Sequence, residues 1–161
     1  MQKKFMKQAI KQALIAKEKD EVPIGAVIVM DGKIISRAHN LMEKRQVATA
    51  HAEILAIEKA CKKLKSWRLD RAEMYVTIEP CAMCAGAIAN ARIKRVYFGA
   101  YEEKSGCAVS KYPVLSDNGL NHATEFEGGI EEEICANIIK NYFKEKRDKK
   151  ALTKKNICHK I

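Results

Sequence analysis

The sequence predicts an α/β fold in which helices cover a sheet whose strands run in both directions. Three features support this prediction. Short apolar runs alternate with amphipathic segments along the chain, as is typical of layered α/β domains. The Asp31-Gly32 turn joins the first two strands into an antiparallel hairpin. Later strands alternate with helical segments, which adds parallel pairs and makes the sheet mixed.

The length and composition are those of a single globular domain. The chain has 161 residues, 47% hydrophobic and 31% charged, and contains no repeat or linker. We predict one domain over residues 1–150 and a basic, flexible tail at 151–161. No apolar run approaches the ~20 residues that span a bilayer, and the basic N-terminal segment lacks a signal-peptide core, so we expect a cytoplasmic protein without membrane contact.

The first half of the chain is expected to form a helix, a hairpin and a second helix. Apolar residues recur at helical spacing over residues 6–14, with lysines on the other face. Residues 26–29 and 33–36 flank the hairpin turn as strands. The polar stretch 40–48 is predicted to be a loop, and apolar residues at helical spacing predict a helix over 50–64.

The second half is expected to alternate strands and helices. Residues 74–78 and 96–99 have the pattern of buried strands, and 122–126 could form one more. Pro80 marks the start of the intervening helix, where its missing N–H costs nothing. Apolar residues spaced over 130–142 predict a C-terminal helix that runs into the basic tail.

The net charge of +10 is concentrated at the C-terminus. Residues 140–161 carry nine Lys or Arg and two Asp or Glu, which is +7 of the total. A solvated helix face explains any single lysine. Taken together, these charges are typical of a surface that binds a polyanion such as RNA.

Two short segments carry residues suited to metal chemistry. They are a His-Ala-Glu triplet at 51–53 and a Pro-Cys-Ala-Met-Cys run at 80–84, each in the first turn of a predicted helix. Cys81 and Cys84 are three residues apart and can face the same side. With His51 they form three ligands for Zn²⁺, which leaves one open position and indicates a catalytic site.

Glu53 is the candidate catalytic residue. A zinc ion at this site would lower the pKa of a bound water. Glu53 lies two residues from His51, so it can face the same cavity and transfer protons to a ring nitrogen and a leaving amine. The combined pattern of H-x-E and P-C-x-x-C is the known signature of zinc nucleobase deaminases. Glu79 directly precedes residues 80–84, the metal turn that holds Cys81 and Cys84. We expect its side chain to support the backbone of this turn.

The sequence resembles the bacterial tRNA adenosine deaminases, which convert the wobble adenosine of a tRNA anticodon to inosine. The resemblance covers residues 6–147. It implies a three-layer, cytidine-deaminase-like fold with a central mixed five-stranded sheet, one zinc ion per chain, a tRNA anticodon stem-loop as partner, and a homodimer. The segments that carry it are 21–27, 49–53, 75–86, 95–100, 104–106 and Asn121-His122.

The resemblance also implies substrate-binding residues. Asn40 is expected to hydrogen-bond the target nucleoside. Glu102 stands where the family usually has an Asp that contacts the ribose, and Lys104 is placed to meet the RNA backbone. His122 is expected to line the anticodon groove, and Phe143 to stack on a neighbouring base.

The chain departs from the family pattern at positions away from the metal set. Val47-Ala48 replaces the usual Asp-Pro, Tyr101-Glu102 replaces the usual Arg-Asp, and Cys107 replaces a small Ala. These changes concern contacts with the ribose and the anticodon, and so the choice of substrate more than the reaction.

Two alternative functions remain at this stage. One is a free-base or nucleotide deaminase of the guanine or cytosine type, which would not need the basic C-terminal helix. The other is a structural zinc or RNA-binding protein without activity. A structural site would want a fourth ligand, and His39 and His122 lie on apparent strand edges. Glu53 would have no obvious structural role in such a protein.

Overall fold

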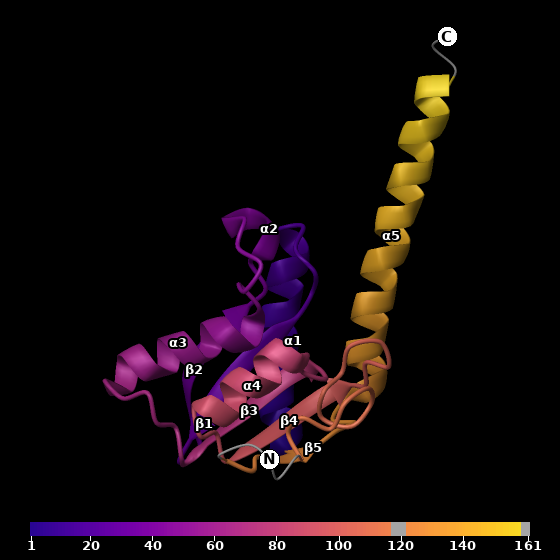
Figure 1. The fold of residues 1–161 in the computed structure, drawn as a ribbon. Coiled ribbons are helices and arrows are strands. Elements are labelled where there is room, and N and C mark those ends of the chain that lie inside the picture. The colour runs from indigo at the N-terminus through magenta and orange to yellow at the C-terminus, as the bar shows by residue number, and fades with distance from the viewer. Residues whose placement is uncertain (117–121, 159–161) are drawn as a thin grey trace.

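Helices and strands alternate along the chain in this computed structural model, which describes residues 1–116 and 122–158 (Figure 1). Asn121 and residues 159–161 lie outside this range. In chain order the elements are α1 (Gln2–Glu18), β1 (Gly25–Met30), β2 (Lys33–His39), α2 (Met42–Arg45), α3 (Ala52–Leu64), β3 (Ala72–Ile78), α4 (Ala82–Asn90), β4 (Arg95–Ala100), β5 (Glu125–Glu127) and α5 (Glu132–Cys158).

The strands form one five-stranded sheet in the order β2-β1-β3-β4-β5. β1 pairs antiparallel with both β2 and β3, whereas β3 with β4 and β4 with β5 are parallel. The prediction of a mixed five-stranded sheet is therefore confirmed. Because β3 and β4 are parallel, their carboxyl ends meet at one edge of the sheet, where α4 begins.

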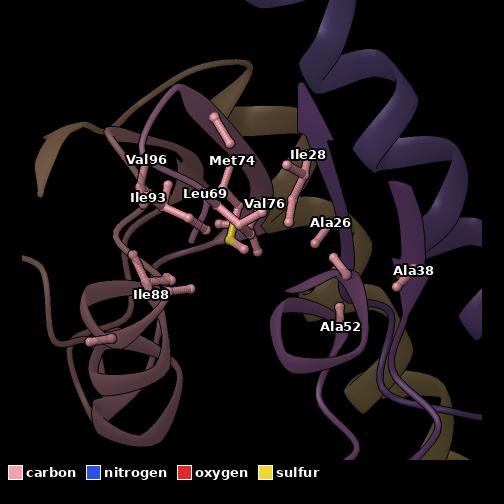
Figure 2. Packing of buried hydrophobic residues seen from close by; sticks show 14 of the residues in the cluster. Ala26, Ile28, Ala38, Ala52, Leu69, Met74, Val76, Ile88, Ile93 and Val96 are labelled. Atoms are coloured by element: carbon pink, nitrogen blue, oxygen red, sulfur yellow. The ribbon is translucent and has the colours of Figure 1, made fainter. Parts of the chain in front are cut away.

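Alternate residues of each strand face two separate apolar cores. Ile28 and Met74 belong to a core formed with α3 and α4, part of which Figure 2 shows. Their neighbours Val27 and Tyr75 belong to a second core formed with α1 and α5. Helices therefore cover both faces of the sheet, which confirms the predicted three layers.

Helix α1 packs very closely on β1 because Gly25 has no side chain. A Cβ at Gly25 would lie 2.1 Å from the Ala9 carbonyl oxygen and 2.4 Å from the Ala13 nitrogen. Ala9 and Ala13 are themselves fully buried. A larger residue at position 25 would separate the helix from the sheet.

Short helix α2 and strand β5 differ from the sequence predictions. Helix α2 lies in the predicted loop 40–48, where the Glu21 carboxylate accepts hydrogen bonds from the backbone N–H groups of Glu43 and Lys44 at 3.1 and 2.6 Å. This tertiary contact leaves no local sequence signal. β5 begins only at Glu125, because the preceding segment bonds the Ile93 carbonyl before the strand pairing starts.

Helix α5 begins against the sheet and then projects away from the body of the fold (Figure 1). Two contacts with Asp20 hold its middle: the Tyr142 hydroxyl donates to the Asp20 carbonyl at 3.0 Å, and Lys146 pairs with the Asp20 carboxylate at 2.5 Å. Residues 147–153 are exposed. The segment expected to be a flexible tail is helical as far as Cys158. Within the described range, none of the helices combines the length and apolar character needed to cross a membrane.

Candidate active site

Two helix N-termini bring the predicted metal-binding residues together. His51 immediately precedes α3 and Cys81 immediately precedes α4, both with extended backbone conformations. Cys84 lies one turn into α4 and is fully buried. One donor atom from each of the three residues falls within 4.8 Å of the others. The structure therefore places these three side chains as a metal site requires.

The distances within this cluster fit a tetrahedral zinc ion. His51 Nδ1 lies 3.8 Å from Cys81 Sγ and 3.6 Å from Cys84 Sγ. Tetrahedral zinc with bonds of about 2.3 Å to sulfur and about 2.0 Å to nitrogen separates such atoms by roughly 3.5 Å. The donor set can therefore accept zinc with little rearrangement.

Hydrogen bonding within the cluster shifts the pKa values of its members. The hydrogen bond with Cys84 lowers the pKa of Cys81 to about 4, although burial opposes this shift. The same hydrogen bond raises the pKa of Cys84, and the contact with Cys81 raises the pKa of His51. The cluster favours a thiolate at Cys81, which is the form that binds metals.

Glu53 is buried beside these ligands with one carboxylate oxygen unsatisfied. The residue is 2% exposed, and its Oε2 has no hydrogen-bond partner in the described part of the chain. Burial raises the pKa of this carboxyl. Buried polar atoms are normally hydrogen-bonded, so an orphaned oxygen beside a metal-binding cluster is typical of a group that acts on a ligand.

A cavity of about 170 Å³ opens over the cluster. It adjoins a wider groove of about 830 Å³, and the two share Val22 and Phe143. The cavity is lined by Val22, Ile24, His51, Glu53, Ile78, Glu79, Cys81, Glu102, Ser105, Ile139 and Phe143. The groove is lined by Lys19, Asp20, Val22, Glu43, Lys44, Tyr142, Phe143 and Lys146.

Glu79 does not serve the metal turn, contrary to the expectation from sequence. Its carboxylate accepts hydrogen bonds from residues 102–110, a segment without regular secondary structure that follows β4. The sequence reasoning missed this role, and that of Glu21 beside α2, because the partners are more than twenty residues away in the chain. Neither contact has a local sequence signal.

The expected substrate-binding residues fall into different surroundings. Glu102 and Phe143 line the cavity. The Lys104 backbone N–H donates to the Glu102 carboxylate at 3.0 Å, and the Lys104 side chain is exposed. Asn40 is 4% exposed, and its amide nitrogen lies 3.5 Å from the Glu21 carboxylate. The structure therefore brings two of these four residues to the cavity itself.

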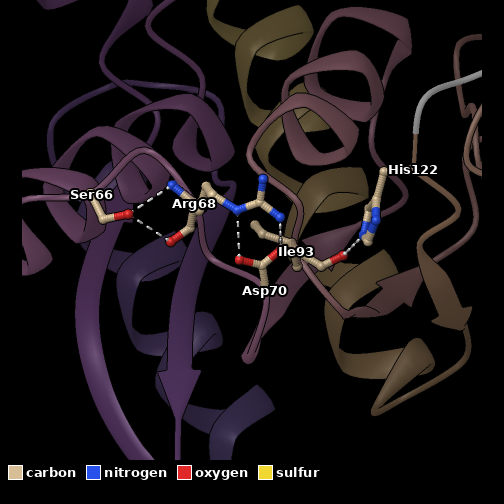
Figure 3. A network of polar contacts seen from close by, with 5 residues as sticks. All are labelled: Ser66, Arg68, Asp70, Ile93 and His122. Carbon is tan, nitrogen blue, oxygen red and sulfur yellow. Dashed lines mark hydrogen bonds and ion pairs between the residues drawn. The ribbon is translucent and has the colours of Figure 1, made fainter.

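His122 lies beside Ile93, which precedes the start of β4 (Figure 3), whereas the cavity-lining residue Glu102 follows the end of that strand. Its Nε2 is 2.9 Å from the carbonyl oxygen of Ile93, just before the strand begins. The Arg68–Asp70 ion pair and the turn at Ser66 are drawn in the same view. At about 3.3 Å per residue, the length of β4 separates His122 from the metal cluster by on the order of 20 Å. Its expected place in the anticodon groove stays a prediction.

Comparisons with known proteins identify similar chains. The profile of the MafB19-like deaminase family matches residues 1–147. A tRNA-specific adenosine deaminase from Bacillus subtilis is 49% identical over 153 residues, which is 95% of each chain. A solved structure from a study of A-to-I editing by tRNA:A34 deaminases at the wobble position is 45% identical, with a TM-score of 0.81 over 84% of this chain and 98% of that one. A guanine deaminase structure from Bacillus subtilis is 43% identical, with a TM-score of 0.59 over 61% of this chain and 63% of that one.

Proposed function

Because this chain belongs to the tRNA-specific adenosine deaminases, we propose that it converts the wobble adenosine of a tRNA anticodon loop to inosine by hydrolysis. In this reaction water replaces the amino group at C6 of the purine and ammonia leaves. The observation that carries the proposal is the buried, unpartnered oxygen of Glu53 beside the His51, Cys81 and Cys84 cluster. The fold is the cytidine-deaminase-like fold that the resemblance implies.

His51, Cys81 and Cys84 would hold one zinc ion. When bound, zinc would act as a Lewis acid that lowers the pKa of a water at its open position. The thiolates of Cys81 and Cys84 would balance the charge of the cation. The N-termini of α3 and α4 add partial positive charge, which favours both thiolates.

Glu53 moves the protons that the substitution at C6 requires. Its carboxylate accepts a proton from the attacking water and passes one to the ring nitrogen next to C6. It then takes the remaining proton from the hydroxyl added at C6 and delivers it to the leaving amino group, so that ammonia departs and the carbonyl of inosine remains. Burial of Glu53 restricts access of bulk water to this carboxylate, and the orphaned oxygen is free to take the proton.

The groove beside the cavity favours an RNA substrate over a free base. Lys19, Lys44 and Lys146 line it and can contact phosphates that flank the reacting nucleotide. Phe143 borders both the cavity and the groove, so it can stack on a base next to the one that enters the site. Asn40, Glu102 and Lys104 keep the substrate roles that the resemblance implies, and His122 is not needed for this arrangement.

The proposal includes a cytoplasmic homodimer. It rests on the family resemblance and on apolar side chains that are exposed in the stretch after β4. Examples are Val109 and Tyr112, which are 52% and 61% exposed. Light scattering of the purified protein would measure its mass. A mass near twice 18.1 kDa is expected.

Deamination of an anticodon stem-loop with a wobble adenosine tests the proposed function. Free guanine, cytosine and adenosine serve as competing substrates. Inosine is expected only in the RNA, with a KM that rises steeply as salt is added because phosphate contacts are screened. Turnover of guanine alone, with little response to salt, would instead support a free-base deaminase. The similarity to the guanine deaminase structure makes guanine the appropriate free base to test.

A further inference from the structure

One wall of the catalytic cavity is a segment without a helix or a paired strand of its own. Residues 102–110 follow β4 and consist of turns, apart from one isolated bridge between Gly106 and Cys81. Glu102 and Ser105 of this segment line the cavity. A wall built from turns needs fixed contacts elsewhere to hold its shape.

The carboxylate of Glu79 supplies most of these contacts. Its Oε1 accepts hydrogen bonds from the backbone N–H groups of Ala108, Val109 and Ser110 at 3.0, 2.7 and 2.9 Å. Its Oε2 accepts from the Glu102 backbone N–H at 3.0 Å and from the Ser110 hydroxyl. Five donors thus converge on one side chain that is 2% exposed. They come from both ends of the segment, so Glu79 ties the two ends together.

Gly106 lets the segment close over this carboxylate. A Cβ at Gly106 would lie 2.4 Å from Glu79 Oε2 and 2.5 Å from the Glu102 carbonyl oxygen. The next residue, Cys107, donates its backbone N–H to the Pro80 carbonyl at 2.7 Å. The segment is therefore fitted to Glu79 sterically as well as through hydrogen bonds.

The chemistry of the side chain suits this role. An ionised carboxylate has only acceptor sites and can take several N–H donors at once. A glutamine of the same shape would present two N–H donors to a site that already holds five. Burial of Glu79 raises the pKa of its carboxyl, but the hydrogen bonds from Ser110, Val109 and Glu102 outweigh it and lower the pKa overall.

We propose that Glu79 is a positioning residue that fixes segment 102–110 as the wall on which the RNA docks. Glu79 acts through this segment and need not touch the reacting atoms. The proposal rests on the proposed function, because the docked ligand is the anticodon loop. It assigns to Glu79 a role in substrate binding that is separate from zinc binding and from proton transfer.

The test compares Glu79→Gln with the control Glu58→Gln, which changes an exposed carboxylate on α3, outside segment 102–110 and the cavity. Deamination of the anticodon stem-loop gives KM and kcat, metal analysis gives zinc content, and amide hydrogen exchange reports on residues 108–110. For Glu79→Gln we expect KM to rise about tenfold or more, kcat to change less than about threefold, and zinc to stay at one per chain. The three amides should exchange faster. The control should match the wild type.

Other outcomes would overturn the proposal. Loss of zinc in Glu79→Gln would assign the residue to the metal turn, and an unchanged KM would leave segment 102–110 without a role in docking. The exchange measurement needs no substrate, so it tests whether Glu79 holds segment 102–110 independently of catalysis. If the wild type fails to deaminate the stem-loop, that result counts against the proposed function and not against this contact.

A second pair of variants covers the case in which Glu79→Gln does not fold. Ser110→Ala removes one donor and keeps the four backbone hydrogen bonds, and it should raise KM about threefold with kcat unchanged. Gly106→Ala forces the carboxylate and the segment apart, so its effect on KM should exceed that of Ser110→Ala. The two should not add in the double variant, because both break the same set of contacts. Additive effects, or no effect of either, would contradict the proposal.

Discussion

Two glutamates border the same cavity in opposite surroundings. Glu53 and Glu79 are each 2% exposed. Glu53 has an oxygen with no partner among the described residues, and burial raises the pKa of its carboxyl. Glu79 is surrounded by five donors, and these hydrogen bonds lower the pKa of its carboxyl despite burial. Two carboxyls with the same small exposed fraction therefore differ: one is suited to exchanging protons, and the other is held as a fixed anion.

The largest expected effect is on turnover after removal of the Glu53 carboxylate. In Glu53→Ala we expect kcat to fall by at least about 10²-fold, which is the low end for loss of a general acid–base group. Zinc content and RNA affinity should persist, as measured by metal analysis and binding titration. Glu58→Ala, an exposed change on the same helix, is the control. Unchanged activity in Glu53→Ala would place the proton shuttle elsewhere and break the comparison.

The second effect concerns the free energy of unfolding. Here substitution of Glu79 should have the larger effect and substitution of Glu53 the smaller one. Glu79→Ala leaves buried N–H donors without an acceptor, so the free energy of unfolding should fall by about 1–3 kcal/mol. Glu53→Gln removes a buried carboxylate with an unsatisfied oxygen, so its stability should be unchanged or higher. Urea denaturation at equal zinc content measures both. A loss in Glu53→Gln as large as that in Glu79→Ala would show that Glu53 has a structural role.

Glu21 shows whether the behaviour of Glu79 is general. Its fully buried carboxylate accepts hydrogen bonds from the backbone N–H groups of Glu43 and Lys44 in α2. We expect Glu21→Ala to lower the free energy of unfolding by about 1–2 kcal/mol, since fewer donors are left unpaired than at Glu79. The same urea experiment would measure it. No loss of stability would mean that water satisfies α2 after the carboxylate is removed.

The smallest expected effect is the pH dependence contributed by His39, a basic counterpart to these acids. Burial, followed by the charges of Lys19 and Lys59, lowers the pKa of His39 from 6.5 to about 4. Its Nδ1 contacts Gln12 Oε1 at 3.2 Å and its Nε2 contacts Lys19 Nζ at 2.9 Å, which suits the neutral ring.

The sign of this effect follows from the lowered pKa. The unfolded chain binds the His39 proton more tightly, so the stability present above about pH 6.5 is lost as the pH falls towards 4. Solvent screens the half-buried ring, so the effect should be small. Urea denaturation of wild type and His39→Gln between pH 7 and pH 4 would measure it, with the flatter profile expected for the variant. Parallel profiles would assign the pH dependence to other groups.

The comparison also shows which features the sequence can predict. The metal set and Glu53 lie in two short segments, so spacing alone placed them on helix N-termini, and alternating periodicity predicted the layers. The contacts of Glu79 join residues 23 to 31 positions apart, which no local pattern encodes. Helix α2 depends on Glu21 in the same way. Residues 151–158 continue α5, an extension that the sequence pattern does not predict because the apolar spacing that indicates the helix ends at Tyr142.

The first half of helix α5 packs on the body of the fold, and the helix then continues beyond Arg147, where residues 147–153 are exposed. An isolated segment of about twelve residues is too short for a stable helix in water, because its first turn is costly to form. In α5 the helical turns before residue 147 are already fixed, because Tyr142 and Lys146 contact Asp20. Residues beyond Arg147 add to an existing end and avoid the nucleation cost. The packed half therefore acts as a template for the outer half, and protection of the amides should decline steadily towards Cys158 as the free end frays.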